Sequence, residues 1–333
     1  MTTPLLSVKD LCVEIPTREG LIRPADSVSW EIDRGETLVI LGESGSGKSV
    51  TAQAIAGILP EPVKVTSGSV HFDGRSVLDD RRFQQSLRGK RIGVVFQNPL
   101  TGLNPGMTVG KQITEMFRVH SDLAKREARE RAIELLKLVQ IPDPKDRVTR
   151  YPHELSGGMR QRVMIAIALS QDPELLIADE PTTALDATVQ AQVIEMLQGI
   201  QQELGTSIVL ITHDIGVASA MATNVVVMYA GRVVEQGGAF DVLRAPRHPY
   251  TQGLLSSVPT IERRSELRAI RGAPPKLHEL APGCAFAPRC DFATEACDLV
   301  VPPLENVGAG TLAACIRADE IVMDSALGSK GAR

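Results

Sequence analysis

The chain has 333 residues, enough for two domains, and its 43% hydrophobic and 23% charged content is ordinary for a globular protein. A net charge of −4 provides no overall attraction to nucleic acid or anionic lipid, and an aromatic content of 3% argues against a surface that stacks bases. No apolar run approaches the roughly 20 residues that cross a bilayer, and the N-terminus lacks a basic region followed by an apolar core. We therefore expect a soluble, cytoplasmic protein that does not bind nucleic acid.

Strands are predicted over residues 5–41 and again over 65–96, where short β-rich runs alternate with turn residues. Residues 108–172 have a helical pattern, in which a solvated amphipathic helix accounts for the longest run of charges. After residue 173, strands and helices alternate, and the strands LLIA and IVLI are apolar enough for a parallel sheet covered on both faces. Prolines accumulate beyond residue 240 and mark a separate extension.

The stretch GESGSGKSV lies between a strand-like apolar run and a helix-spaced one. It matches the pattern G-x-x-x-x-G-K-[ST], in which glycines let backbone N–H groups converge on a phosphate at the start of a helix. An ordinary strand-to-helix turn is the alternative. We expect nucleotide binding, with Lys48 at the β- and γ-phosphates and the Ser49 hydroxyl on Mg²⁺. The predicted binding residues are Gly42, Ser44, Gly45, Ser46, Gly47, Lys48, Ser49 and Val50.

Two acidic residues follow the apolar strand ELLIA. Asp179 can hold Mg²⁺, through water, while Glu180 polarises an attacking water for in-line transfer; a surface acid pair is the alternative. His213 follows the strand SIVLIT at the carboxyl edge where ligands gather in open α/β sheets. A lone histidine there is usually structural, but beside the other motifs it is interpreted as a γ-phosphate contact.

The stretch LSGGMRQR begins at Leu155 and supplies a second anion site on the same chain. Ser156 can cap a helix, and the two glycines that follow, including Gly158, expose the first N–H groups of that helix. If each nucleotide lies between the P-loop of one molecule and this helix of another, neither subunit alone has a complete site. Binding of ATP would then join two subunits, and hydrolysis would release them.

With these motifs the chain resembles an ATP-binding cassette subunit of a transporter. The family's motifs occur in order from residue 5 to about 240, and they include Gln97 and Leu185 with Asp186. The resemblance implies that Gln97 contacts Mg²⁺ and senses the membrane subunits, that the LSGG serine and second glycine meet the γ-phosphate across the dimer, and that Asp186 links the two sites. Where the family usually has an aromatic residue on adenine, this chain has Ile15, so apolar packing is expected instead of stacking.

The resemblance also implies the domain organisation. We expect an α/β P-loop ATPase core with a mixed sheet over residues 1–240, a helical subdomain over about 98–172, and a small cysteine-containing extension over 241–333. FQNPLTGLNP, from Phe96, and RHPYTQGLL, from Arg247, are similar to stretches of dipeptide and oligopeptide importer ATPases, a group that includes nickel and some glycoside importers.

This group implies an ATPase that drives peptide import, with nickel or glycoside import as alternatives. The expected partners are a second ATPase chain, different from this one rather than identical, two transmembrane permeases and, indirectly, an extracytoplasmic binding protein. The expected location is the cytoplasmic face of the membrane. A cassette that acts on DNA or ribosomes is disfavoured, because Lys48 and Leu155 are too close for an inserted coiled coil and one cassette is present. A regulatory binder would be expected to lack Glu180 or His213.

Four of the five cysteines crowd into the last sixth of the chain, whereas Cys12 stands alone. In a cytoplasmic protein such clustering suggests metal before disulfides. The spacing C-x5-C-x6-C-x17-C contains no C-x-x-C pair, which lowers the case for zinc. Because relatives have a similar cysteine region, Cys284, Cys290, Cys297 and Cys315 are predicted to hold a 4Fe–4S cluster that staples the proline-rich segment. Zinc and four buried structural cysteines are the alternatives.

Overall fold

A computed structural model describes residues 3–183, 185–257, 270–308 and 310–321. Parts of the predicted extension, at 258–269, 309 and 322–333, lie outside the described residues. The strands are β1 (Leu6–Thr17), β2 (Gly20–Ile32), β3 (Thr37–Leu41), β4 (Lys64–Phe72), β5 (Arg75–Ser76), β6 (Ile92–Val95), β7 (Leu175–Asp179), β8 (Ser207–Thr212), β9 (Asn224–Tyr229), β10 (Arg232–Gly238), β11 (Glu305–Asn306) and β12 (Leu312–Ala313).

The α-helices are α1 (Lys48–Ala56), α2 (Arg81–Leu87), α3 (Pro99–Gly102), α4 (Val109–His120), α5 (Lys125–Leu138), α6 (Pro144–Arg147), α7 (Gly157–Ala168), α8 (Ala187–Leu204), α9 (Ile215–Met221), α10 (Ala239–Arg244), α11 (Pro249–Ser256) and α12 (Glu295–Leu299). Two 3-10 turns complete the described elements, η1 (Pro152–Glu154) and η2 (Ala287–Arg289).

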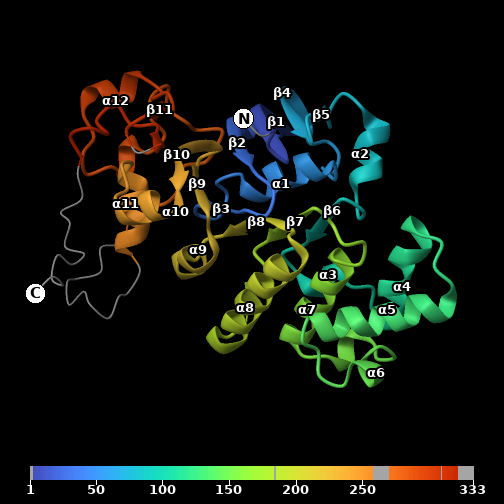
Figure 1. Ribbon diagram of the computed structural model, residues 1–333. Coiled ribbons are helices and arrows are strands. Elements are labelled where there is room, and N and C mark those ends of the chain that lie inside the picture. Colours follow the sequence, from blue (N-terminus) through green and yellow to red (C-terminus); the bar gives the residue numbers. More distant parts are fainter. Residues whose placement is uncertain (1–2, 184, 258–269, 309, 322–333) are drawn as a thin grey trace, which may run out of the picture.

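Over the described residues the strands form two sheets (Figure 1). The smaller sheet is antiparallel, with the order β2-β1-β4-β5. The larger sheet has the order β11-β12-β10-β9-β3-β8-β7-β6; its strands from β9 to β6 are parallel, and β10, β12 and β11 are antiparallel. The predicted α/β class with a mixed sheet is therefore confirmed.

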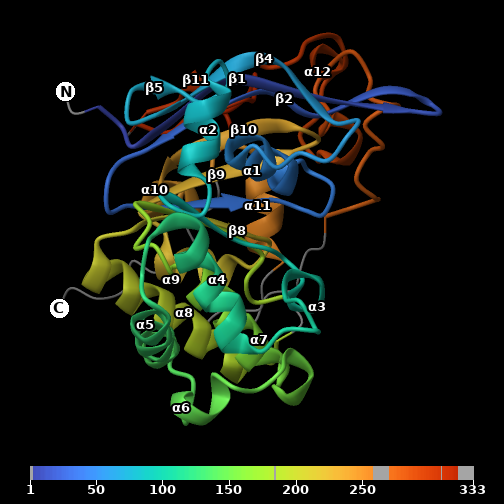
Figure 2. The same ribbon diagram turned by 90° about the vertical axis from the view of Figure 1, so that its right-hand side faces the viewer.

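Successive residues of the central strands point into two different cores. In β3, Leu38 and Ile40 belong to a core shared with the antiparallel sheet and α1, whereas Val39 and Leu41 belong to a core shared with the helices on the other face. Figure 2 shows these layers, with β1, β2 and β4 on one side of the larger sheet and α5, α7 and α8 on the other. Coverage on both faces explains why these strands are continuously apolar rather than alternating.

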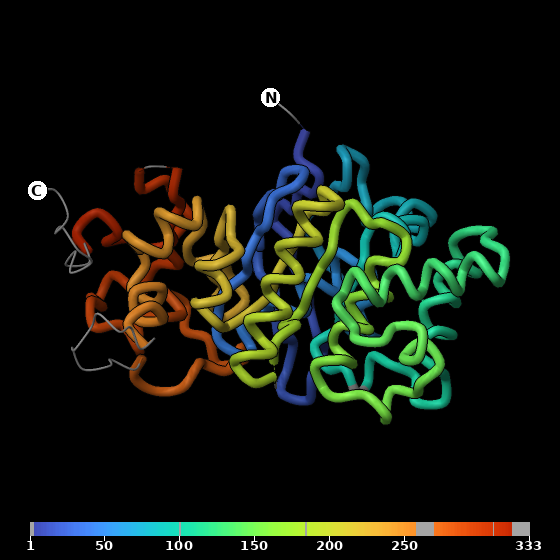
Figure 3. Tube along the Cα trace, turned by 60° about the horizontal axis from the view of Figure 1, so that its bottom comes forward, coloured from blue at the N-terminus to red at the C-terminus, as the bar shows by residue number. Residues whose placement is uncertain are grey.

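Helices α3 to α7 gather at one end of the molecule, and the described part of the extension lies at the opposite end (Figure 3). The apolar stripe predicted on α5 is buried at Ala128, Ala132, Leu135 and Leu136, while its charged residues face solvent. A helical segment is therefore present in the region where the sequence predicts one.

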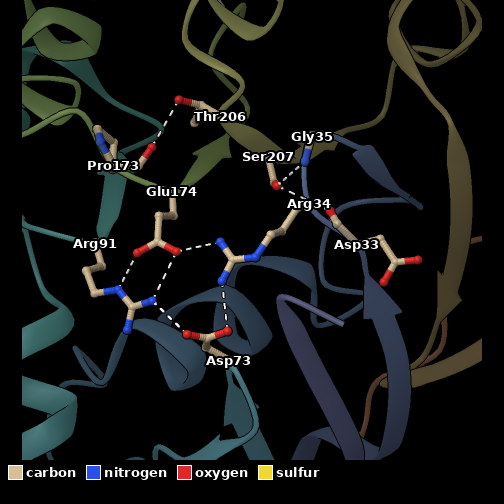
Figure 4. A network of polar contacts seen from close by, with 9 residues as sticks. All are labelled: Asp33, Arg34, Gly35, Asp73, Arg91, Pro173, Glu174, Thr206 and Ser207. Carbon is tan, nitrogen blue, oxygen red and sulfur yellow. Dashed lines mark hydrogen bonds and ion pairs between the residues drawn. The ribbon is translucent and has the colours of Figure 1, made fainter. Parts of the chain in front are cut away.

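A network of ion pairs connects the two sheets at the amino ends of the parallel strands (Figure 4). Asp73, between β4 and β5, accepts hydrogen bonds from Arg34 at 2.8 Å and from Arg91 at 3.1 Å. Glu174, before β7, accepts from the same two arginines, with Arg34 at 2.6 Å. The arginines, Arg91 first, hold the pKa of Glu174 below its ordinary value. This edge is opposite to the edge where β3 enters the glycine-rich loop.

The extension is continuous with the larger sheet. β12 pairs with β10, and β11 pairs with β12. The carboxylate of Glu235, fully buried in β10, accepts hydrogen bonds from the backbone N–H groups of Arg247 at 2.6 Å and His248 at 3.0 Å. Tyr250 and Phe286 belong to the same core as the helical face of the sheet. Backbone pairing and a shared core thus hold the proline-rich region, which has few regular elements of its own.

Candidate functional site

The glycine-rich loop joins β3 to α1, where the backbone leaves no space for side chains at two positions. Gly42 has φ 153°, and a Cβ there would lie 2.3 Å from the Met228 carbonyl oxygen. Gly47, the N-cap of α1, has φ 100°, and a Cβ there would lie 1.8 Å from the Pro24 carbonyl oxygen. Only glycine satisfies both conditions. The loop therefore turns tightly into the helix, whose first N–H groups have no partner within the helix.

Lys48 lies beneath this loop with 4% of its surface exposed. Its ammonium donates hydrogen bonds to the carbonyl oxygens of Gly42 at 2.7 Å and Glu43 at 2.9 Å. Burial lowers the pKa of Lys48, and the nearby carboxylates of Glu180 and Asp179 oppose that effect. The predicted contact of Lys48 with the β- and γ-phosphates stays a prediction, since these hydrogen bonds place the ammonium against the loop backbone.

Ser49 and Asp179, which are predicted Mg²⁺ ligands, lie together although 130 residues separate them. The Ser49 hydroxyl donates to Asp179 Oδ1 at 2.9 Å. Asp179 ends β7 next to β8, so its carboxylate reaches the first turn of α1. Burial raises the pKa of Asp179, and the hydrogen bond from Ser49 opposes the rise. Two hard oxygen donors thus meet at the carboxyl edge of the sheet.

Glu180 is the centre of a second group of polar contacts. Gln97 Nε2 donates to Glu180 Oε2 at 3.1 Å, Thr183 Oγ1 donates to the same oxygen at 2.7 Å, and His213 Nδ1 lies 3.4 Å from Oε1. Burial alone raises the pKa of Glu180, but the hydrogen bond from Thr183 and the charge of His213 outweigh it, so the pKa is lowered. The backbone of Glu180 has φ 46°, a strained value for a non-glycine residue that is typical of functional sites.

The predicted second anion site lies at the start of α7. Ser156 is the N-cap, and its hydroxyl accepts from the Met159 N–H at 3.3 Å. A Cβ at Gly158 would lie 2.6 Å from Val189 in α8, so this helix start packs closely on the next one. Asp186 caps α8 through the N–H groups of Thr188 and Val189. In the part of the chain that the structure describes, no hydrogen bond joins the α7 start to residues 42–50, where the first anion site is predicted.

Ile15, the residue predicted beside adenine, lies half-buried in β1 opposite Ile22 of β2. Both belong to the antiparallel sheet, which also carries Pro24, the residue that contacts Gly47.

Two family models match the chain: "ABC transporter" over residues 25–183 and "Oligopeptide/dipeptide transporter, C-terminal region" over residues 234–297. The chain is 50% identical over 309 residues to the oligopeptide transport ATP-binding protein OppD of Bacillus subtilis, with 92% of this chain and 86% of that protein aligned. It is 45% identical to the dipeptide transport ATP-binding protein DppD of Haemophilus influenzae, covering 91% of this chain and 93% of that protein. The chain belongs to the ABC transporter family.

Solved ABC cassettes have the same fold. The dimeric cassette MJ0796 bound to ADP and Pi superposes with a TM-score of 0.64 at 30% identity, over 70% of this chain and 98% of that one. The cassette cbiO1 of Clostridium perfringens superposes with a TM-score of 0.62 at 34% identity, over 72% of this chain and 91% of that one. This chain is accordingly an ABC-type ATPase. Among its described residues, no helix is both long and apolar enough to cross a membrane.

The 4Fe–4S cluster predicted in this ABC protein is wrong, and so is the zinc alternative. All four cysteines line one small apolar pocket and are free thiols. Within the described ranges, however, no group of three or more His, Cys, Asp or Glu side chains is placed to hold a metal ion. Burial raises the pKa of Cys284 and of Cys315, and raises that of Cys290 to about 11, which favours the neutral thiol over the thiolate that binds metal.

Sequence reasoning missed four residues that shape the ABC site. No motif in the sequence points to Thr183, although its hydroxyl donates to the Glu180 carboxylate. Glu43 is a variable position of the P-loop pattern, yet it contacts both Tyr250 and Arg289. Tyr250 lies in the quoted stretch RHPYTQGLL, and Arg289 lies between two of the cysteines, so each was close to a recognised signal.

Proposed function

We propose that this ABC-type ATPase binds ATP with Mg²⁺ at the P-loop and that hydrolysis drives the import of peptides. The observation that carries the proposal for the site is the hydrogen bond from Ser49 to Asp179, because it unites the P-loop helix and the acidic end of β7 at one point. The tight glycine turn supports the proposed phosphate position. A Cβ at Gly42 or Gly47 would collide with a backbone carbonyl oxygen, so only glycine allows the loop this close turn. Oxygen donors of this kind suit Mg²⁺.

The proposed roles follow from the contacts. Lys48 and the loop N–H groups would bind the phosphates, and Ser49, Asp179 and Gln97 would hold Mg²⁺, which neutralises charge on the phosphates. Glu180 would orient and deprotonate the attacking water. Its lowered pKa supports this role, since an ionised carboxylate is required to accept a proton. His213 would contact the γ-phosphate while staying close to Glu180.

A complete site would need two subunits. The start of α7 offers its first N–H groups to an anion, with Ser156 as the cap, and it makes no hydrogen bond to residues 42–50 of its own subunit over the described chain. We propose that ATP lies between the P-loop of one subunit and Ser156 and Gly158 of another, and that Asp186 lies at this subunit interface. The dimeric MJ0796 cassette, named as such with ADP and Pi bound, supports this arrangement. The partner is proposed to be a different ATPase chain.

Peptide import is proposed from the relatives. OppD and DppD are named for oligopeptide and dipeptide transport, and the C-terminal region matches the model named for such transporters. The chain would act at the cytoplasmic face of the membrane with two transmembrane permeases, supplied with solute by an extracytoplasmic binding protein. The C-terminal match favours peptides over nickel or glycosides, since its description names oligopeptides and dipeptides.

Two measurements test this function. Calorimetric titration of the purified chain with ATP and Mg²⁺ should give binding that Lys48→Ala abolishes and Lys64→Ala, at an exposed position of β4, leaves intact. Equal affinities for all three chains would contradict the P-loop assignment. In cells, copurification with two membrane permeases and loss of labelled dipeptide uptake after deletion are expected. Undiminished peptide uptake would refute the substrate class while leaving the ATPase assignment intact.

A further inference from the structure

Glu43, the second residue of the P-loop, is held from three directions. Its backbone N–H donates to the Tyr250 hydroxyl at 2.8 Å, and its carbonyl oxygen accepts from the Lys48 ammonium at 2.9 Å. Its carboxylate forms two hydrogen bonds with the Arg289 guanidinium, at 2.7 and 3.0 Å. Tyr250 and Arg289 both belong to the C-terminal extension. The extension therefore contacts the loop that is proposed to hold the phosphates.

Arg289 is itself fixed, with only 6% of its side chain exposed. Its guanidinium donates to the carbonyl oxygens of Arg271 and Gly272 and to the Tyr229 hydroxyl. It also lies over the rings of Tyr229 and Phe286, at 5.7 and 6.0 Å from their centres. A guanidinium with this many partners cannot move away from Glu43 at low cost, because each donor would lose its acceptor. Arg289 thus presents a rigid, bidentate anchor to the loop.

Tyr250 acts on the peptide unit that joins Gly42 to Glu43. The N–H of this unit donates to Tyr250, and its carbonyl accepts from Lys48 at 2.7 Å. The N–H and C=O groups of a trans peptide point in opposite directions within one plane. By accepting from the N–H, the fully buried Tyr250 therefore orients the carbonyl oxygen that accepts from Lys48. Each of the two hydrogen bonds polarises the other. The hydroxyl also gives this N–H group a hydrogen-bond acceptor, so rotation of the whole peptide unit would cost that bond.

We propose that Arg289 and Tyr250 are positioning residues for ATP: they preform the P-loop and neutralise the carboxylate of Glu43 beside the phosphate position. The inference rests on the proposed nucleotide site. An unpaired carboxylate in a loop that binds a polyanion would repel the phosphates, and pairing with Arg289 removes that repulsion. A loop held in its binding conformation also loses less entropy when the ligand binds.

Neutralisation of Glu43 by Arg289 predicts a rescue that a purely structural role of Arg289 would not produce. Arg289→Gln leaves the Glu43 carboxylate unpaired, so the Kd for ATP with Mg²⁺ should rise roughly tenfold. Glu43→Gln removes that charge, so the double variant Glu43→Gln, Arg289→Gln should bind within roughly threefold of the parent. Arg317→Gln is the matched control, since it removes a paired arginine of the same extension that contacts Glu320 and not the loop, and it should leave Kd unchanged.

The experiment is a calorimetric titration of the full chain with ATP and Mg²⁺, with thermal unfolding recorded for each variant. Tyr250→Phe keeps the ring in the core and should raise Kd roughly fivefold, which tests the loop if Arg289→Gln does not fold. A Kd for Arg289→Gln and Tyr250→Phe within twofold of the parent, or a double variant no better than Arg289→Gln alone, would overturn the inference. If one of these two results occurs and Lys48→Ala still loses ATP binding, the inference about Arg289 and Tyr250 is wrong but the proposed nucleotide site is retained. If the parent chain itself does not bind ATP, the proposed nucleotide site is wrong.

Discussion

We predict that the buried imidazole of His248 makes the stability of the folded chain depend on pH. It is 1% exposed and caps α11, where its Nδ1 accepts a hydrogen bond from the Tyr250 N–H at 3.1 Å, so this nitrogen carries no proton. The backbone N–H of His248 donates to the buried Glu235 carboxylate. Burial lowers the pKa of His248 from 6.5 to about 3, against a smaller opposing effect from a hydrogen bond to the Ala314 backbone. The folded chain therefore keeps this imidazole neutral at any pH near neutrality.

The direction and size of the effect follow from proton linkage. Between the folded pKa of about 3 and the unfolded value of 6.5, the unfolded chain binds one more proton at His248 than the folded chain. The free energy of unfolding consequently falls as pH falls through this window. Lowering the pH from 7 to 5 should remove about 1.9 kcal/mol of stability through this residue. The pKa of Glu235 is raised by burial, so Glu235 contributes with the opposite sign in an overlapping window, and a comparison of variants must cancel it.

His248→Asn isolates the histidine. The asparagine side-chain oxygen can accept from the same N–H and is a favoured N-cap, so α11 keeps its cap while the titrating group is lost. Urea unfolding at pH 7 and pH 5 should show a loss of stability smaller by about 1.9 kcal/mol in His248→Asn than in the parent. The exposed His153→Asn is the control and should behave like the parent. Equal pH dependence in the parent and His248→Asn would refute a neutral, buried His248.

Glu180→Gln should retain ATP binding but lower turnover in the assembled transporter by about 10²-fold or more, because the base is removed while Lys48 remains; turnover close to that of the parent would contradict the role of Glu180. Ile15→Ala should weaken ATP binding by no more than about 1–3 kcal/mol and Ile15→Tyr should tighten it; equal affinities in calorimetry would place the base elsewhere. Glu174→Gln should lower the free energy of unfolding by about 1 kcal/mol, less at high salt, since its ion pairs are partly exposed; urea unfolding unaffected by the substitution would contradict this.

Local chemistry made much of the site predictable from the sequence. The P-loop motif is one short run of consecutive residues, and Gly42 and Gly47 suit the positive φ angles of that run, although the carbonyl groups that exclude a Cβ there belong to the distant residues Met228 and Pro24. Ser156 caps α7 through its own helix, as the sequence predicts. The placement of Asp179 and His213 at one sheet edge follows from the rule that parallel strands end together, because each follows a recognisable apolar run. The alternation of strands and helices was readable for the same reason: it depends on neighbours within a few residues.

Tertiary structure alone decided which distant side chains meet. Tyr250 and Arg289 reach Glu43 across 207 and 246 residues, and no periodicity or motif spacing records such a pairing. The cysteines are a case in which the sequence pattern misled. Their crowding in the sequence suggested a metal site, but spacing does not specify how thiols are oriented or solvated. In the described residues the four cysteines line an apolar pocket instead. The helices, the strands and the residue patterns of the two predicted anion sites could be read from the sequence, since these patterns depend on adjacent residues. Tertiary packing decides how the extension pairs with the sheet and how Tyr250 and Arg289 contact the P-loop, because those contacts form only once the whole chain has folded.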